Sequence, residues 1–164
     1  MKVELKNVKH MESLSRETNC FTASLYIDGE KAGTVENEGQ GGNTSYSITN
    51  DTLEQAYENY AKSLPSIKTD LEIDGVPFVL KMNGENLIDE LFESWLHEKK
   101  ESQRFARFEK KFKKQFAAKG LKTIRITLEQ QRGWLACSSE ADALIEVEKF
   151  ETKNNIVVKT WEIL

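Results

Sequence analysis

Hydrophobic and polar residues alternate along the first part of the chain, which is the period of half-buried β-strands. The alternation is clearest in 21–27, where every second position is apolar, and it is also present in 1–5. Asp28 and Gly29 follow directly, and both residue types tolerate the positive φ angles of a tight turn. The pattern therefore predicts a hairpin in which a strand at 31–36 returns antiparallel to 21–27.

Helical spacing of apolar residues predicts a short helix over 53–64. Asp51 and Thr52 offer an N-cap, and Pro65 ends the segment because proline disfavours a helical residue before it. A second, much longer helical pattern follows later in the chain.

This longer pattern covers 87–119, and Asn86 is a candidate for its N-cap. It contains two apolar stripes separated by the wholly polar segment 97–104. We interpret the whole pattern as one continuous or bent helix, with a break near Ser102 as the alternative. Gly120 ends the pattern, as glycine commonly does after a helix.

The remaining apolar runs have the spacing of strands. Their order around the two helices predicts an α+β fold with a mainly antiparallel sheet, one short helix and one long amphipathic basic helix. Because no repeat or Pro/Ser-rich linker interrupts the chain, we expect a single domain over 1–164. The remaining strands are predicted at 71–73 and 77–82 around Asp74-Gly75, and at 121–128, 143–150 and 156–163, with a turn entering a buried segment at 134–139.

The composition is that of a globular protein. The chain has 164 residues, of which 38% are hydrophobic and 30% charged, with two prolines. These values exclude collagen-like, disordered and disulfide-dense classes. The N-terminus lacks the apolar region of a secretory signal, and no apolar run reaches the ~20 residues that cross a bilayer. We therefore expect a soluble, cytoplasmic protein with no membrane partner; the sequence carries no signal for its oligomeric state.

Charge is strongly segregated along the chain although the formal net charge is only −4. Residues 1–98 carry 8 Lys/Arg against 18 Asp/Glu, a net of −10. Residues 99–125 carry 11 against 2, a net of +9, and 126–164 carry 4 against 7, a net of −3. Such asymmetry indicates either a binding face for an anion or complementarity within the molecule.

The basic residues gather on one side of the second half of the long helix. Four phenylalanines in 105–116 fall within an arc of about 80°, which predicts packing on the sheet. The basic face opposite is interpretable as a solvated surface, as a site for an anionic small ligand or a protein partner, or as a nucleic-acid contact. The pI of 5.4 and the lack of aromatic residues on the polar side weigh against nucleic acid. The basic face contains Arg104, Arg107, Lys110, Lys111 and Lys114.

A glycine-rich loop lies at 37–45. Gly39, Gly41 and Gly42 give the backbone freedom to point successive N–H groups at one anion. The loop is neither a P-loop nor a dinucleotide fingerprint, because the lysine and the glycine spacing of those motifs are absent. It is therefore a plain connecting loop or a ligand contact.

No catalytic, cofactor or metal motif is present, and the sequence favours a non-enzymatic protein without a cofactor. Cys20 and Cys137 lie far apart and, with His10 and His97, do not supply the paired spacings of a zinc site. Free, buried thiols are expected, with a nucleophilic Cys/His pair as the alternative. A metal site built from scattered carboxylates would leave no motif.

The segment 20–46 resembles a block found in small uncharacterised accessory proteins of bacteriophages and prophages. That block reads Phe-x-Ala-x-Leu/Ile-Tyr-Ile/Val-Asp-Gly, three residues, Gly, then Asn-Asp/Glu-Gly-x-Gly-Gly. The acidic and then lysine-rich helix is loosely similar too, whereas the part from Leu121 onward is not clearly covered. The matching residues are Phe21, Ala23, Leu25, Tyr26, Ile27, Asp28, Gly29, Gly33, Asn37, Glu38, Gly39, Gly41 and Gly42.

This resemblance implies a small phage-encoded protein in the host cytoplasm that binds and neutralises a host component, such as a defence protein or a nucleotide signal. We expect a phosphate-bearing ligand or a host protein as partner. Alternatives are a nucleic-acid-binding protein that uses the basic helix 99–119, and a metal-assisted hydrolase. The candidate ligand-binding residues are Gly39, Gly41, Gly42, Arg104, Arg107, Lys111 and Lys114.

Overall fold

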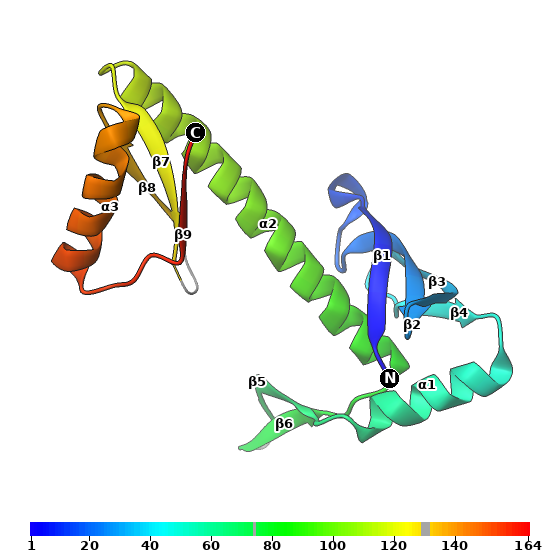
Figure 1. Ribbon diagram of the computed structural model, residues 1–164. Helices are drawn as coiled ribbons and strands as arrows, with labels where there is room; N and C mark the ends of the chain where they lie inside the picture. Colours follow the sequence, from blue (N-terminus) through cyan, green and yellow to red (C-terminus); the bar gives the residue numbers. More distant parts are fainter. Residues whose placement is uncertain (74, 129–131) are drawn as a thin grey trace. The chain divides into compact units, whose positions relative to one another are not determined.

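The computed structural model describes residues 1–73, 75–128 and 132–164. The chain forms two compact units, Met1–Leu96 (unit 1) and His97–Leu164 (unit 2), shown in Figure 1. The expectation of a single domain over 1–164 stays a prediction. The elements are β1 (Val3–His10), the 3-10 helix η1 (Glu12–Leu14), β2 (Cys20–Ile27), β3 (Glu30–Glu38), β4 (Ser45–Ile48), α1 (Asp51–Ser63), β5 (Ile67–Ile73), β6 (Val76–Leu80), α2 (Gly84–Ala117), β7 (Lys122–Thr127), β8 (Arg132–Cys137), α3 (Glu140–Asn154) and β9 (Thr160–Ile163).

Unit 1 is built on a four-stranded antiparallel sheet with the strand order β1-β2-β3-β4. The predicted hairpin is confirmed, because Ile27 pairs with Glu30 across the turn. Asp28 and Gly29 have φ angles of 50° and 91°, as a two-residue hairpin turn requires. The Asp28 carboxylate also accepts a hydrogen bond from the Lys2 backbone N–H at 2.7 Å, which ties β1 to the turn.

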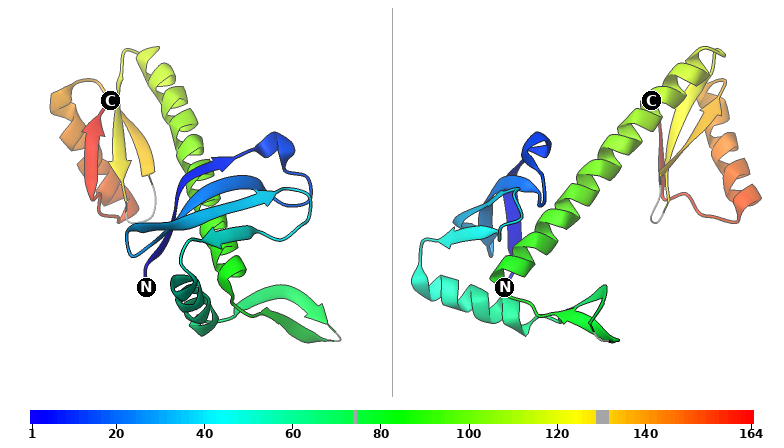
Figure 2. Two further views of the ribbon diagram at one scale, coloured as in Figure 1. Left: turned by 90° about the vertical axis from the view of Figure 1, so that its right-hand side faces the viewer. Right: turned by 180° about the vertical axis from the view of Figure 1, so that it is seen from behind.

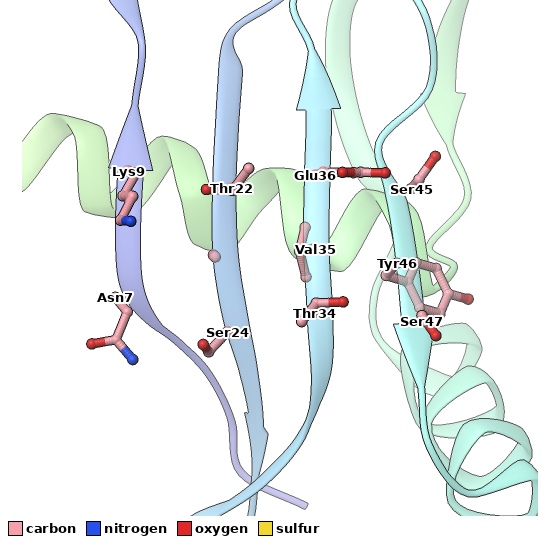
Figure 3. Close-up of a pocket in the computed structure, with 11 residues that line it drawn as sticks. Asn7, Lys9, Thr22, Ser24, Thr34, Val35, Glu36, Ser45, Tyr46 and Ser47 are labelled. Carbon is pink, nitrogen blue, oxygen red and sulfur yellow. The ribbon is translucent and has the colours of Figure 1, made fainter.

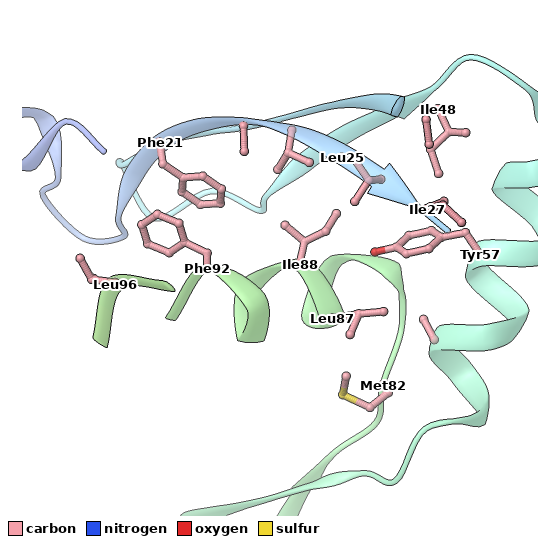
Figure 4. Close-up of a cluster of buried hydrophobic side chains, with 14 residues drawn as sticks. Phe21, Leu25, Ile27, Ile48, Tyr57, Met82, Leu87, Ile88, Phe92 and Leu96 are labelled. Atoms are coloured by element: carbon pink, nitrogen blue, oxygen red, sulfur yellow. The ribbon is translucent and has the colours of Figure 1, made fainter. Parts of the chain in front are cut away.

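The core of unit 1 lies between this sheet and the helices α1 and α2 (Figure 4). Alternate residues of β2 point inward, as the sequence pattern predicted, and Leu25 has no exposed surface. The ring of Phe21 stacks on Phe92 of α2 with 3.8 Å between centroids. Tyr57 of α1 is fully buried, and its hydroxyl donates to the Gly84 carbonyl at 2.6 Å. The start of α2 is therefore fixed against both the sheet and α1.

The helix α1 matches the predicted short helix, but its N-cap lies one residue earlier than the predicted one. Asn50 is the cap, and its side chain accepts a hydrogen bond from the Leu53 N–H. The strands β5 and β6 confirm the predicted second hairpin in outline. Its proposed turn residue Asp74 lies outside the described residues.

The predicted long helix is confirmed as one continuous helix, α2, without a break near Ser102. Asn83, and not Asn86, supplies the cap, because the Asn83 side chain accepts the Asn86 N–H at 2.8 Å. Gly120 follows the C-terminus with a φ angle of 70°, and the Leu121 N–H donates to the Phe116 carbonyl at 2.9 Å. Residues 84–96 of α2 belong to unit 1 and 97–117 belong to unit 2.

Unit 2 contains a three-stranded antiparallel sheet with the order β8-β7-β9. Ile124 and Ile126 of β7 are fully buried and pack with Ala143 and Val147 of α3. The second half of α2 lies along the opposite face of this sheet (Figure 2). The chain as a whole is thus α+β with antiparallel sheets, as predicted.

Two predictions for the C-terminal third are wrong, and a third is confirmed only in part. The predicted strand 143–150 lies within helix α3, because Ser139 caps a helix there and Ala143, Val147 and Phe150 share one helical face. The predicted turn at 134–139 is mostly strand β8, paired along its length with β7. The predicted strand 156–163 is reduced to β9 at its end.

Candidate functional site

Five of the basic residues of α2 form one line along the helix. Their spacings of four, three, four and three residues place them on a single face, because residues three and four apart are neighbours on a helix surface. At a rise of 1.5 Å per residue the line is about 21 Å long. We call this line the basic stripe; it consists of Lys100, Arg104, Arg107, Lys111 and Lys114, all of them exposed.

A concavity of about 430 Å³ lies along the N-terminal part of the basic stripe, from Lys100 to Lys111. Three of the four basic site residues predicted from the sequence line it, and Lys114 does not. The complete lining is Lys100, Gln103, Arg104, Arg107, Phe108 and Lys111.

The charges of the stripe are largely uncompensated. Arg104 approaches Glu101 at 3.5 Å, but its side chain is 65% exposed, and such surface pairs contribute about 0–1 kcal/mol. Within the described parts of the chain, Arg107, Lys111 and Lys114 form no ion pair. The stripe therefore presents at least three positive charges to solvent.

Two other basic residues near α2, Arg125 and Lys113, are neutralised within unit 2. Arg125 of β7 donates from Nε and Nη2 to the Glu109 Oε2 atom at 2.9 and 2.5 Å, and it also pairs with Glu162. Lys113 lies 3.5 Å from Glu109. Arg125 and Lys113 thus belong to an ion-pair cluster within unit 2, whereas Arg107, Lys111 and Lys114 of the basic stripe face solvent.

Glu109 makes the stability of unit 2 dependent on pH. Burial raises the pKa of its carboxyl group, but the hydrogen bonds and charges of Arg125 and Lys113 outweigh this, and the net pKa is lowered. A carboxyl group whose pKa is lowered by folding stabilises the folded state at pH values above its pKa in the unfolded chain, about 4.3 for glutamate. This stabilisation is lost as the pH falls through the pKa of Glu109 in the folded protein.

We expect Glu109→Gln to lower the free energy of unfolding by about 1 kcal/mol at pH 7. The difference between variant and wild type should be smaller at pH 3 than at pH 7, because the stabilisation that comes from the lowered pKa of Glu109 is lost as the pH falls. Thermal denaturation at the two pH values measures this. An equal difference at pH 7 and pH 3 would contradict the assignment of the ion pair.

An aromatic cluster holds the apolar side of α2 on the sheet of unit 2. The Phe112 ring stacks on Trp134 with 5.4 Å between centroids, and Phe105 and Phe108 lie 6.1 and 6.3 Å from the same indole. The predicted packing of the phenylalanine face on the sheet is thus confirmed for Phe105 and Phe112, whereas Phe108 stays partly exposed. This packing fixes the rotation of α2 and points the basic stripe away from the sheet.

The glycine loop belongs to unit 1, and the N–H groups of Gly39 and Gly41 already have partners. The Gly39 N–H donates to the Asn37 Oδ1 atom at 2.8 Å, and the Gly41 N–H donates to the Thr18 hydroxyl at 3.2 Å. A Cβ atom at Gly41 would collide with the carboxylate of Glu17. An anion bound here would replace internal hydrogen bonds and face a negative charge.

Gly42 completes this loop as part of a buried polar network. Its carbonyl accepts a hydrogen bond from the Asn37 side chain at 3.4 Å, and the same amide donates to Thr44 at 2.9 Å. The Thr44 hydroxyl donates in turn to Asp89 of α2 at 2.5 Å. Through Asn37 and Thr44, these contacts tie the loop to α2.

A second concavity of about 520 Å³ lies on the outer face of the four-stranded sheet (Figure 3). The strand register aligns its polar side chains in rows across β1 to β4. This face was not among the sequence predictions, although the alternating polar positions of the strands indicate where it lies. The rows consist of Lys9, Thr22, Glu36 and Ser45, and of Ser24, Thr34 and Ser47. Asn7 lies beside the second row, at the bulge of β1 (Figure 3).

The lining of this concavity carries one lysine and one glutamate, so it has no net charge to select a ligand. Its other side chains are small hydroxyls and an amide, which bind water as readily as a solute. The stripe on α2 therefore remains the better candidate.

The two thiols and the Ser15 hydroxyl are engaged in structure. Cys20 and Cys137 are free and buried, as expected, and burial raises the pKa of the Cys137 thiol. Ser15 lies 3.4 Å from His10, but its hydroxyl donates to the Met11 carbonyl and accepts the Cys20 N–H. Across residues 1–73, 75–128 and 132–164, no three His, Cys, Asp or Glu side chains are grouped to hold a metal.

The chain matches no protein-family model, no curated protein and no solved structure at a significant level. The resemblance to phage accessory proteins therefore stays a prediction. In the part of the chain that the structure describes, no helix has both the length and the apolar character to span a membrane.

Proposed function

We propose that this chain is a non-enzymatic binding protein that holds nucleic acid by its phosphate backbone along the basic stripe. The observation that carries the proposal is the line of five cations over about 21 Å, of which at least three form no ion pair with the residues that the structure describes. Clustered lysine and arginine side chains supply the phosphate contacts that dominate affinity for nucleic acids. A nucleic acid presents phosphates in a row and so matches the stripe in shape and in sign.

The geometry supports a polymer better than a single phosphate-bearing nucleotide. Sites for small ligands are concave and bury most of the ligand. All residues lining the concavity on α2 come from one helix, so a small ligand would contact it from one side only. The backbone N–H groups of Gly39 and Gly41, which the nucleotide hypothesis invoked, are occupied within unit 1.

The resemblance to phage proteins suggests what such binding would achieve. In that setting the nucleic acid is a host component, or belongs to a host defence complex, and binding would neutralise it. A protein partner with an acidic surface shares the charge chemistry of a phosphate backbone. The experiment below separates these two ligands.

The affinity of the full chain for a labelled 20-nucleotide single-stranded DNA, measured by fluorescence anisotropy, should fall steeply with salt. Four phosphate contacts give a slope of about −2.8 for log K against log salt concentration, because each contact releases condensed counterions. Between 50 and 200 mM salt the affinity should therefore decrease about 50-fold.

Two results would overturn the proposal. One is the absence of binding to DNA and RNA oligonucleotides at 50 mM salt, which would leave an acidic protein as the partner of the stripe. The other is binding that does not change with salt, because such binding would not use the phosphates.

A further inference from the structure

The basic stripe is accompanied by an exposed aromatic ring, which the sequence analysis did not expect on the polar side of the helix. Phe108 is 38% exposed and lines the concavity together with the basic residues. It is four residues after Arg104 and three before Lys111, so it is a helical neighbour of both. An apolar ring thus lies within reach of two cations of the stripe.

The Phe108 ring is held in place by its neighbours. The indole of Trp134 lies 6.3 Å away between centroids, and the Arg104 guanidinium carbon lies 5.6 Å from the ring centroid. Trp134 itself is fixed by stacking on Phe112. A ring supported in this way offers a planar surface that loses little conformational entropy when a ligand covers it.

We propose that the stripe prefers single-stranded to double-stranded nucleic acid, with the phosphates along the cations and one base stacked on Phe108 and Arg104. This inference rests on the proposed function and names its ligand class more narrowly. Proteins that bind single strands combine a basic groove with aromatic rings on which bases stack. In a duplex the bases are stacked on one another, and only the backbone would reach the stripe.

The shape of the concavity agrees with this assignment. It measures about 430 Å³ and is lined from one helix only, so a base can lie against the ring while the rest of the strand continues along the helix. One planar group fits beside the ring, whereas the basic residues that continue to Lys114 extend beyond the concavity and suit the backbone. The site is therefore divided into a stacking part and a phosphate part.

The variant Phe108→Leu tests the stacking part, since leucine keeps an apolar contact with Trp134 but has no aromatic face. Its affinity for single-stranded DNA should fall about 10-fold, as expected for the loss of one base–aromatic stack. The slope against salt should stay that of the wild type, because no phosphate contact is removed. Phe108→Trp should restore the affinity.

An abasic oligonucleotide of the same length and a duplex are the controls, because they provide phosphates without accessible bases. Phe108→Leu should bind both as the wild type does, and the wild type should bind both more weakly than the single strand. Equal wild-type affinity for single strand, abasic strand and duplex would overturn the single-strand preference while leaving the proposed function intact. Absence of binding to all three would instead overturn the proposed function.

Discussion

Replacing Phe92 with alanine is expected to lower the free energy of unfolding by about 3–5 kcal/mol, the usual cost of removing a buried phenylalanine side chain. Phe92 is 2% exposed and stacks on Phe21 of β2 at 3.8 Å. It also contacts the rings of His10 and Trp95, at 5.6 and 5.7 Å between centroids. The substitution leaves a cavity between α2 and the sheet of unit 1, and rigid aromatic neighbours cannot close it.

Urea denaturation followed by the fluorescence of the tryptophans measures this loss. Hydrogen exchange of the β2 and β3 amides should locate it in unit 1. Leu14→Ala is the matched control, because Leu14 is 55% exposed and its truncation should cost less than about 0.5 kcal/mol. A loss below about 1 kcal/mol for Phe92→Ala would show that the core is not centred on this ring pair.

The fold of unit 1 follows from signals that are local in the sequence. The alternation of 21–27 and the turn residues Asp28 and Gly29 predicted the hairpin, because a two-residue turn fixes the register of its strands. Helical spacing and Gly120 likewise predicted the long helix and its end.

The error at 143–150 has a physical cause. Leu144 and Ile145 are apolar, and they made the segment look like a buried strand, but in α3 they are 51% and 48% exposed. The residues that decide the structure are the cap Ser139 and the inward-facing pair Ala143 and Val147. The exposed apolar residues Leu144 and Ile145 therefore hid the helical spacing of the buried residues Ala143 and Val147.

The candidate site was predicted in part. Arg104, Arg107 and Lys111 were identified from their common helix face, and the structure places these three around one concavity. Lys100 was missed because it lies in the polar segment between the apolar stripes. Phe108 was counted with the core, since its partial exposure depends on how closely α2 packs against Trp134, and no sequence period encodes that distance.

The largest effect on binding is expected from reversing three charges of the stripe together, as Arg107→Glu, Lys111→Glu and Lys114→Glu. Charge-assisted hydrogen bonds contribute roughly 1.5 kcal/mol or more each, so losing three of them weakens binding about 1,000-fold. The new carboxylates also repel the phosphates. Because all three positions are exposed and glutamate favours helices, α2 should retain its structure.

A control variant separates the stripe from the overall charge of the protein. Lys31→Glu, Lys149→Glu and Lys153→Glu change the net charge by nearly the same amount, and all three lysines are exposed and lie outside α2. The loss of long-range attraction alone should weaken the binding of this control by less than about 10-fold at 0.15 M salt, because charges more than about 8 Å apart are largely screened at that salt concentration. Circular dichroism confirms that both variants are folded.

The ratio of the two variants' affinities for the same single-stranded oligonucleotide at 0.15 M salt tests the nucleic-acid-binding role of the basic stripe most directly. We expect the stripe variant to bind at least about 100-fold more weakly than the control variant, which is the quotient of the two expected losses. Equal affinities of the two folded variants would contradict this role, because they would show that the position of the positive charges does not matter.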